Sequence, residues 1–369
     1  QKEGMISFTA GSPSAEEFPA QELAALAKDV FATQAVTVLS YGVTEGYQPL
    51  RQWIADDLQR SGIQREGDDT IVISGGQQAL DFTAKCLLND GDTVLTEAPT
   101  FLNALNTFRT YGARIVGVPM DGEGMDMDAL EQALRLEKSV KFIYTIPNFQ
   151  NPMGVTLSAA RRRRMYDLAE QYDVMILEDD PYGRLRYSGT PVDAIKTLDR
   201  SERVIYTGSF SKIIAPGIRV AYLCAPKELM AKMVVAKQCV DVHTNMLSQV
   251  LVYEYLTRYD LDAHIRQCCD HYRVKRDAML MAIERYFPAE VAVTRPEGGL
   301  FLWITLPEGC SGMELHQRTT AAGVAAVPGK PFNIENDRGL RMNFSVPSLQ
   351  EIDEGVARMG AVLRDFLQK

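Results

Sequence analysis

Short hydrophobic runs alternate with amphipathic segments through the middle of the chain. Between several runs the apolar positions recur at helical spacing, most clearly over residues 128–136 and 158–172, the latter opened by Ser158 as an N-cap. Runs without polar alternation are typical of a parallel sheet covered on both faces. The pattern predicts an α/β fold whose large domain has a seven-stranded, mostly parallel sheet between helices. The seven runs cover residues 71–74, 93–97, 114–119, 141–147, 174–179, 203–209 and 219–226.

The alternation ends in a long helical stretch over residues 226–286. Strand-like runs follow, separated by one helical segment and closed by another, which predicts a smaller α+β domain. We expect the first 39 residues to pack against it, so that residues 40–250 form the large domain and residues 1–39 with 251–369 the small one. The four runs cover residues 291–295, 300–306, 324–327 and 340–345, and the two helices 312–322 and 349–367.

Composition narrows the class of protein. The chain has 369 residues, 46% of them hydrophobic, with a net charge of −9 and a pI near 5.2, which argues against nucleic acid as a partner. No apolar run is long enough to span a membrane, and the N-terminus lacks a signal-peptide pattern. The six cysteines show no metal-binding spacing. These features indicate a reduced, cytoplasmic enzyme without a metal, although a start at Gln1 leaves room for upstream residues.

Polar residues follow the ends of the runs, where open parallel sheets bind ligands. The first run ends in Ser74-Gly75-Gly76-Gln77-Gln78 and leads into a helix. Glycines at such a turn can expose backbone N–H groups to an anion, or simply allow a tight turn. The spacing is not that of a dinucleotide fingerprint.

The next polar groups follow the fourth and fifth runs. Asn148 and Asn151 lie in a segment stiffened by two prolines and are expected to face the crevice. Glu178-Asp179-Asp180 places three carboxylates together, which is costly unless a cation or proton is near. A solvated acidic loop or a metal site are the alternatives.

The sixth run ends in Ser209-Phe210-Ser211-Lys212, with Arg219 seven residues later. A desolvated lysine beside a guanidinium has a lowered pKa and becomes a nucleophile able to hold a carbonyl. The hydroxyls and the arginine suit a phosphate. A solvated loop is the alternative for this motif taken alone. Together, the groups at the run ends match what pyridoxal phosphate requires: anion donors, a carboxylate for its ring nitrogen and an amine for its aldehyde.

The chain resembles the fold-type I pyridoxal-phosphate aminotransferases of class I/II, including the 2-aminoadipate and kynurenine aminotransferases. Four motifs occur in family order and spacing: Asn-Pro-x-Gly at 151–154, Asp-x-x-Tyr at 179–182, Ser-x-Ser-Lys at 209–212 and a late arginine, Arg341. The resemblance implies transamination between a 2-amino acid and a 2-oxo acid such as 2-oxoglutarate by a ping-pong mechanism.

The resemblance also implies site residues. Lys212 resembles the Schiff-base lysine and proton shuttle, Asp179 the partner of the pyridine nitrogen, and Asn151 with Tyr182 the pair that binds the phenolic oxygen. Gly11, Asn151 and Arg341 are implied to bind substrate, with Arg341 on its α-carboxylate. Tyr41 matches a tyrosine that reaches the phosphate of a neighbouring subunit, which implies a homodimer. The other implied cofactor-binding residues are Gly76, Gln77, Phe101, Ser209, Ser211 and Arg219.

Three features depart from the family pattern. Phe101 stands where a tyrosine usually covers the cofactor ring, and Met153 replaces the usual threonine. No arginine precedes Arg51, whereas aminoadipate-type enzymes carry one in a mobile N-terminal element for a distal carboxylate. We therefore expect a broad range of aliphatic or aromatic amino acids rather than a strong dicarboxylate preference.

Two other functions would use the same residues. The same residues would serve another pyridoxal-phosphate chemistry such as β-elimination. An aminotransferase-like sensory domain of a bacterial transcription regulator would also share them, with a DNA-binding domain upstream. The arginines at 161–164 predict a solvated helix face, and His243 and His264 are expected to be structural.

Overall fold

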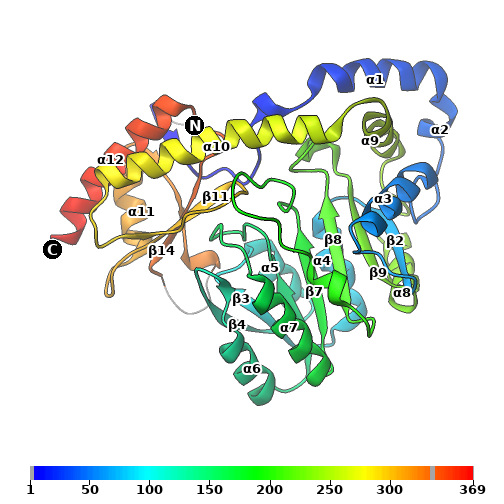
Figure 1. The fold of residues 1–369 in the computed structure, drawn as a ribbon, viewed down its shortest axis with the longest axis horizontal. Coiled ribbons are helices and arrows are strands. Elements are labelled where there is room, and N and C mark those ends of the chain that lie inside the picture. Colours follow the sequence, from blue (N-terminus) through cyan, green and yellow to red (C-terminus); the bar gives the residue numbers. More distant parts are fainter. Residues whose placement is uncertain (1–3, 333–336, 369) are drawn as a thin grey trace.

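The computed structural model describes residues 4–332 and 337–368 and centres on an eight-stranded sheet (Figure 1). Seven strands correspond to the seven predicted runs, and the eighth, β5, is a two-residue strand that pairs antiparallel with β4. Only β5 and β9 run against their neighbours, so the sheet is mostly parallel as predicted. In spatial order the strands are β2 (Asp68–Ile73), β9 (Ala221–Pro226), β8 (Val204–Ser209), β7 (Met175–Asp180), β6 (Val140–Thr145), β3 (Thr93–Ala98), β4 (Arg114–Asp121) and β5 (Gly124–Met125).

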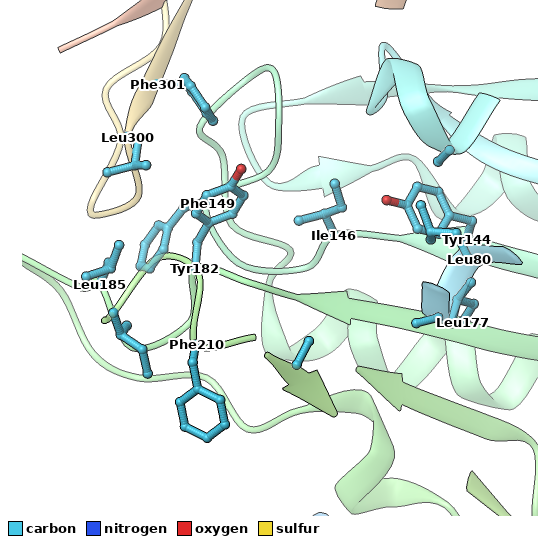
Figure 2. Packing of buried hydrophobic residues seen from close by; sticks show 14 of the residues in the cluster. Leu80, Tyr144, Ile146, Phe149, Leu177, Tyr182, Leu185, Phe210, Leu300 and Phe301 are labelled. Carbon is cyan, nitrogen blue, oxygen red and sulfur yellow. The ribbon is translucent and has the colours of Figure 1, made fainter. Parts of the chain in front are cut away.

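Both faces of this sheet are buried, because successive side chains of a strand point to opposite faces. On β6, Phe142 and Tyr144 pack into one core, while Ile143 packs into the other. The first core includes α4 (Gly76–Leu87), α5 (Leu102–Thr110) and α8 (Lys227–Gln238), and Figure 2 shows part of it around Tyr144 and Leu177. The second includes α6 (Met127–Leu136) and α7 (Ala159–Gln171).

A smaller sheet lies beside the first and contains the four later runs. Its strands, in spatial order, are β10 (Ala292–Val293), β11 (Phe301–Thr305), β14 (Gly339–Asn343) and β13 (Val327–Pro328). Two helices accompany it, α11 (Gly312–Ala321) and α12 (Leu349–Leu367), and α10 (Leu261–Tyr286) packs along α12. In Figure 1, α10 extends from the α9 side of the molecule to this second sheet.

The N-terminal residues contact two different later segments. Strand β1 (Ile6–Ser7) pairs with β12 (Val324–Ala325) in the later segment. Helices α1 (Ala20–Thr33) and α2 (Ala35–Leu39) instead contact α9 (Met246–Arg258), because Val30, Val38 and Val250 form a small core of their own. The remaining helices are α3 (Gln48–Arg60) and four 3-10 turns at Ala15–Glu17, Ile195–Leu198, Pro216–Ile218 and Lys330–Phe332.

The topology directs the carboxyl ends of six strands to one edge of the large sheet. Since β9 is antiparallel to both β8 and β2, the latter two point the same way, as do β7, β6, β3 and β4. From β3 the chain passes to β4 on one side, and then returns to β6 on the other. Such a reversal of strand order is where open α/β sheets bind ligands beyond their carboxyl ends.

Candidate active site

A cavity of about 390 Å³ lies at this edge. The structure brings to its wall every residue predicted for the site except Tyr41, from the N-terminal segment, the large sheet and β14. The predicted residues that line it are Gly11, Gly76, Gln77, Phe101, Asn151, Asp179, Tyr182, Ser209, Ser211, Lys212, Arg219 and Arg341.

Lys212 follows β8 and reaches into this cavity. Its Nζ donates a hydrogen bond to the Gly11 carbonyl oxygen at 2.9 Å. Loss of solvation, followed by the positive charges of Arg341 and Arg219, lowers the pKa of Lys212 to about 8. The two causes expected from the sequence, loss of solvation and a nearby guanidinium, both act on Lys212.

The three carboxylates at the end of β7 point to three different places. Asp179 faces the cavity and accepts a hydrogen bond from the Tyr144 hydroxyl at 2.9 Å. Glu178 accepts from the backbone N–H groups of Ile195 and Lys196. Asp180 accepts from Asn148, Gly183 and Tyr206. Separate partners explain how the run Glu178-Asp179-Asp180 is tolerated.

Burial dominates the charge state of Asp179. It raises the pKa of this carboxyl to about 7, with Asp180 acting in the same direction, while Tyr144 and Lys212 oppose the rise. A cationic ring nitrogen placed against Asp179 would favour the carboxylate form. The side chain is thus suited to a partner that carries a positive charge.

Arg341, from β14, is held between two aromatic rings. Its guanidinium carbon lies 4.3 Å from the Phe301 ring centroid and 5.3 Å from that of Phe332. The two terminal nitrogens donate to Asn151 Oδ1 at 3.1 Å and to the Thr9 carbonyl at 3.0 Å. The buried Nε has no hydrogen-bond partner among the described residues. An unmatched donor on a buried cation fits an anionic ligand.

The turn before α4 and the loop before β9 meet at the wall of the cavity. Gly75 has a φ of 90°, and a Cβ there would collide with the guanidinium of Arg219. Arg219 itself has a φ of 58° and donates to the Ser74 carbonyl at 3.3 Å. Around Gly76, where α4 begins, space is open. A cation beside an open helix N-terminus fits the phosphate of the cofactor.

Tyr41 is the predicted residue that does not reach this cavity. It is 89% exposed, and its ring contacts the His243 ring edge-on with centroids 5.8 Å apart. The role that the resemblance assigns to Tyr41 across two subunits stays a prediction.

Two expectations about neighbouring residues were wrong. Arg162 is 1% exposed rather than part of a solvated face, and its guanidinium donates to Asn148 Oδ1 at 2.7 Å and to four backbone carbonyls. Asn148 in turn donates to Asp180 and lines a separate cavity, not the crevice. The signal for Arg162 was its spacing, since it stands in helical register with buried Met165, Tyr166 and Ala169.

Sequence reasoning also missed Tyr144, whose hydroxyl contacts Asp179. Its position two residues after Phe142 placed it on a buried face, and a buried tyrosine hydroxyl usually has a partner. The cavity wall thus carries a lysine with a lowered pKa, a buried carboxylate, an anion-binding turn and an arginine whose Nε has no hydrogen-bond partner among the described residues. These groups define the class of protein: an enzyme that uses pyridoxal phosphate on substrates with a carboxylate.

The comparisons with known proteins identify the family. Residues 3–359 match the model of the aminotransferase class I and II family. Aromatic-amino-acid aminotransferase 1 of Thermococcus litoralis is 43% identical over 99% of this chain and 89% of its own. The 2-aminoadipate transaminase of Thermus thermophilus is 39% identical over 100% and 92%. The solved Pyrococcus horikoshii kynurenine aminotransferase, in complex with PMP, superposes with a TM-score of 0.97 at 39% identity, over 100% of this chain and 93% of that one.

The chain belongs to the class I and II aminotransferases and is a pyridoxal-phosphate-dependent enzyme of amino-acid transamination. These relatives support transamination as the activity of this chain. Among the described residues, no helix has the length and hydrophobicity to cross a membrane.

Proposed function

We propose that this aminotransferase takes neutral aliphatic and aromatic 2-amino acids and passes the amino group to a 2-oxo acid, 2-oxoglutarate included, in a ping-pong cycle. The observation that supports this range is the charge of the cavity wall. Its cations are Lys212, Arg219 and Arg341, and no other lysine or arginine lines it among the residues that the structure describes. Because no cation of the wall is dedicated to a distal carboxylate, the cavity does not select for dicarboxylates, and neutral side chains can enter it as well as 2-oxoglutarate.

Lys212 and Asp179 carry the proposed chemistry. Bound pyridoxal phosphate would supply an aldehyde for the substrate nitrogen and an electron-poor ring that acidifies the substrate Cα–H. With a pKa near 8, the Lys212 Nζ can hold or release a proton near neutral pH, so it is suited to move a proton to and from Cα. Asp179 would hold the ring nitrogen in its protonated form, and Tyr182 with Asn151 would bind the phenolic oxygen.

Arg341 would orient the substrate. Its free Nε and its two terminal nitrogens can bind the α-carboxylate, and the rings of Phe301 and Phe332 keep water from the guanidinium faces. The phosphate would be bound by Arg219, Ser209, Ser211 and the turn at Gly76-Gln77. Phe101 would cover the ring, and Gly11 would contact the substrate.

A homodimer with shared active sites is part of the proposal, as is a cytoplasmic location. Apolar side chains lie exposed around Tyr41, among them Val36 at 81%, Leu39 at 74% and Val43 at 59%. Covering such a group by a second copy would remove it from water and place Tyr41 in an interface. Sedimentation of the full chain tests this, since a monomer at micromolar concentration would contradict it. We further propose that residues 40–250 and residues 1–39 with 251–369 act as two domains.

A panel of amino donors tests the substrate range. The sharpest pair is norleucine and 2-aminoadipate, which share a straight six-carbon chain and differ in the terminal methyl or carboxylate. We expect a higher kcat/KM for norleucine, and measurable activity with leucine and phenylalanine. Strict selectivity for 2-aminoadipate or aspartate would refute the proposed range.

A further inference from the structure

A buried ion pair lies behind the turn that precedes α4. The Lys237 side chain, in the last turn of α8, is fully buried, and its Nζ lies 2.8 and 2.9 Å from the two carboxylate oxygens of Asp241. It also donates to Thr244 Oγ1 at 3.0 Å. Neither charged residue lines the active-site cavity. The reaction therefore does not account for a charge buried at this place.

Asp241 is tied directly to the turn. Its Oδ2 accepts hydrogen bonds from Ser74 Oγ at 2.7 Å and from Gln78 Nε2 at 2.9 Å. Gln78 closes the turn by accepting from the Ser74 N–H at 2.7 Å. The two ends of the turn, Ser74 and Gln78, are thus held by one carboxylate.

The turn needs such an external support because of its own sequence. Gly75 and Gly76 lie between the two held residues, and glycine has the widest range of backbone conformations. The Ser74 carbonyl also accepts the hydrogen bond from Arg219. A shift of Ser74 would therefore move both the first N–H groups of α4 and the Arg219 guanidinium.

We propose that Asp241, held by Lys237, is a positioning residue for the site that binds the cofactor's phosphate. Asp241 itself touches no ligand. It fixes the turn and, through Ser74, the Arg219 guanidinium, and these two groups would bind the phosphate. The inference rests on the phosphate role proposed above for Gly76, Gln77 and Arg219.

The chain offers a matched control in a second buried lysine. Lys196 Nζ lies 2.8 Å from both Asp68 Oδ1 and Asp199 Oδ2, and its side chain is 1% exposed. None of these three residues lines the cavity. Substituting Lys196 disturbs a buried ion pair of the same chemistry away from the turn.

The test compares pyridoxal phosphate with pyridoxal, which lacks the phosphate, as ligands of the full chain. The double variant Lys237→Met/Asp241→Leu removes both charges, so no unpaired charge stays buried. It removes the bonds of Ser74 and Gln78 to Asp241 and the 3.3 Å bond from Lys237 Nζ to Gln78 Oε1. It should therefore weaken pyridoxal phosphate binding about tenfold and leave pyridoxal binding within about twofold. Lys237→Met/Asp241→Asn keeps an oxygen acceptor and should recover most of the affinity. The control variant Lys196→Met/Asp68→Asn/Asp199→Asn, which likewise leaves no buried charge unpaired, should change neither ligand's affinity.

A gentler variant keeps the test decisive if the double variant does not fold. Ser74→Ala removes the hydrogen bond from Ser74 Oγ to Asp241 and should weaken pyridoxal phosphate binding about threefold, with pyridoxal unaffected. Unchanged pyridoxal phosphate affinity, or equal losses for both ligands, would overturn the positioning role alone. If the unmodified protein binds both ligands equally well, the proposed phosphate site is wrong and this inference fails with it.

Discussion

Replacing Tyr144 with Phe removes one hydroxyl from a packed core and, with it, the 2.9 Å hydrogen bond to Asp179. A hydrogen bond to a charged group contributes about 1.5–3 kcal/mol, and a pKa unit corresponds to about 1.36 kcal/mol. Because the hydroxyl stabilises the carboxylate form, its loss should raise the pKa of Asp179 by about one to two units from its present value of about 7.

The direction of the effect on cofactor binding follows from the charge that Asp179 must carry. Its folded-state pKa is already raised by burial, and the carboxylate that would hold the protonated ring nitrogen is lost as pH falls through that pKa. In Tyr144→Phe the loss should begin at higher pH. The acidic limb of the pyridoxal phosphate affinity profile should therefore move up by about one to two pH units.

Tyr206→Phe is the matched control, since Tyr206 is buried and donates to the neighbouring carboxylate of Asp180 at 3.1 Å. The assay is the dissociation constant of pyridoxal phosphate measured at intervals between about pH 5 and 9, with folding monitored by circular dichroism. Coincident profiles for the Tyr144 variant and the unmodified protein would refute the reasoning. An equal shift in the Tyr206 control would show that the hydroxyl at 144 has no specific effect.

Three further outcomes are expected. Lys212→Ala should abolish transamination, and borohydride should no longer fix the cofactor to the chain, as intact-mass measurement would show; retained activity would contradict the assignment. Arg341→Gln should raise KM for amino acids about 100-fold through loss of charge-assisted hydrogen bonds, measured by steady-state kinetics; an unchanged KM would place the α-carboxylate elsewhere. Leu177→Ala, at a fully buried position, should lower the free energy of unfolding by about 2–5 kcal/mol in urea titration, and a loss below about 1 kcal/mol would argue against tight packing there.

The strands of the large sheet were predictable because burial on both faces leaves a continuous apolar run, as in β6 and β7. The cavity wall was predictable for a related reason. Parallel strands deliver their carboxyl ends to one edge, so the polar residues that end the runs, such as Asp179 and Ser209, meet there. Periodicity alone did not show β5, since two residues are too few to carry a pattern.

What escaped prediction are contacts between residues far apart in the chain. Arg162 looked like a surface charge because four of its five acceptors lie 14 or more residues away in the chain. Asp241 meets Ser74 across 167 residues of sequence, and nothing local to either residue indicates the other. The Tyr144 hydroxyl depends on which strand neighbours β6. A pattern within one segment reports burial, whereas the partner of a polar group is decided by how segments assemble.

The N-terminal segment approaches the active site through its main chain. The carbonyl oxygens of Thr9 and Ala10 accept from Arg341, and that of Gly11 accepts from Lys212. Every amino acid provides such a carbonyl, so substitutions at positions 9 and 10 can preserve these contacts. Substitutions in this segment can therefore change the side chains near the substrate, while Arg341 and Lys212 keep their hydrogen bonds to the backbone. In this architecture substrate preference can evolve separately from the groups that react.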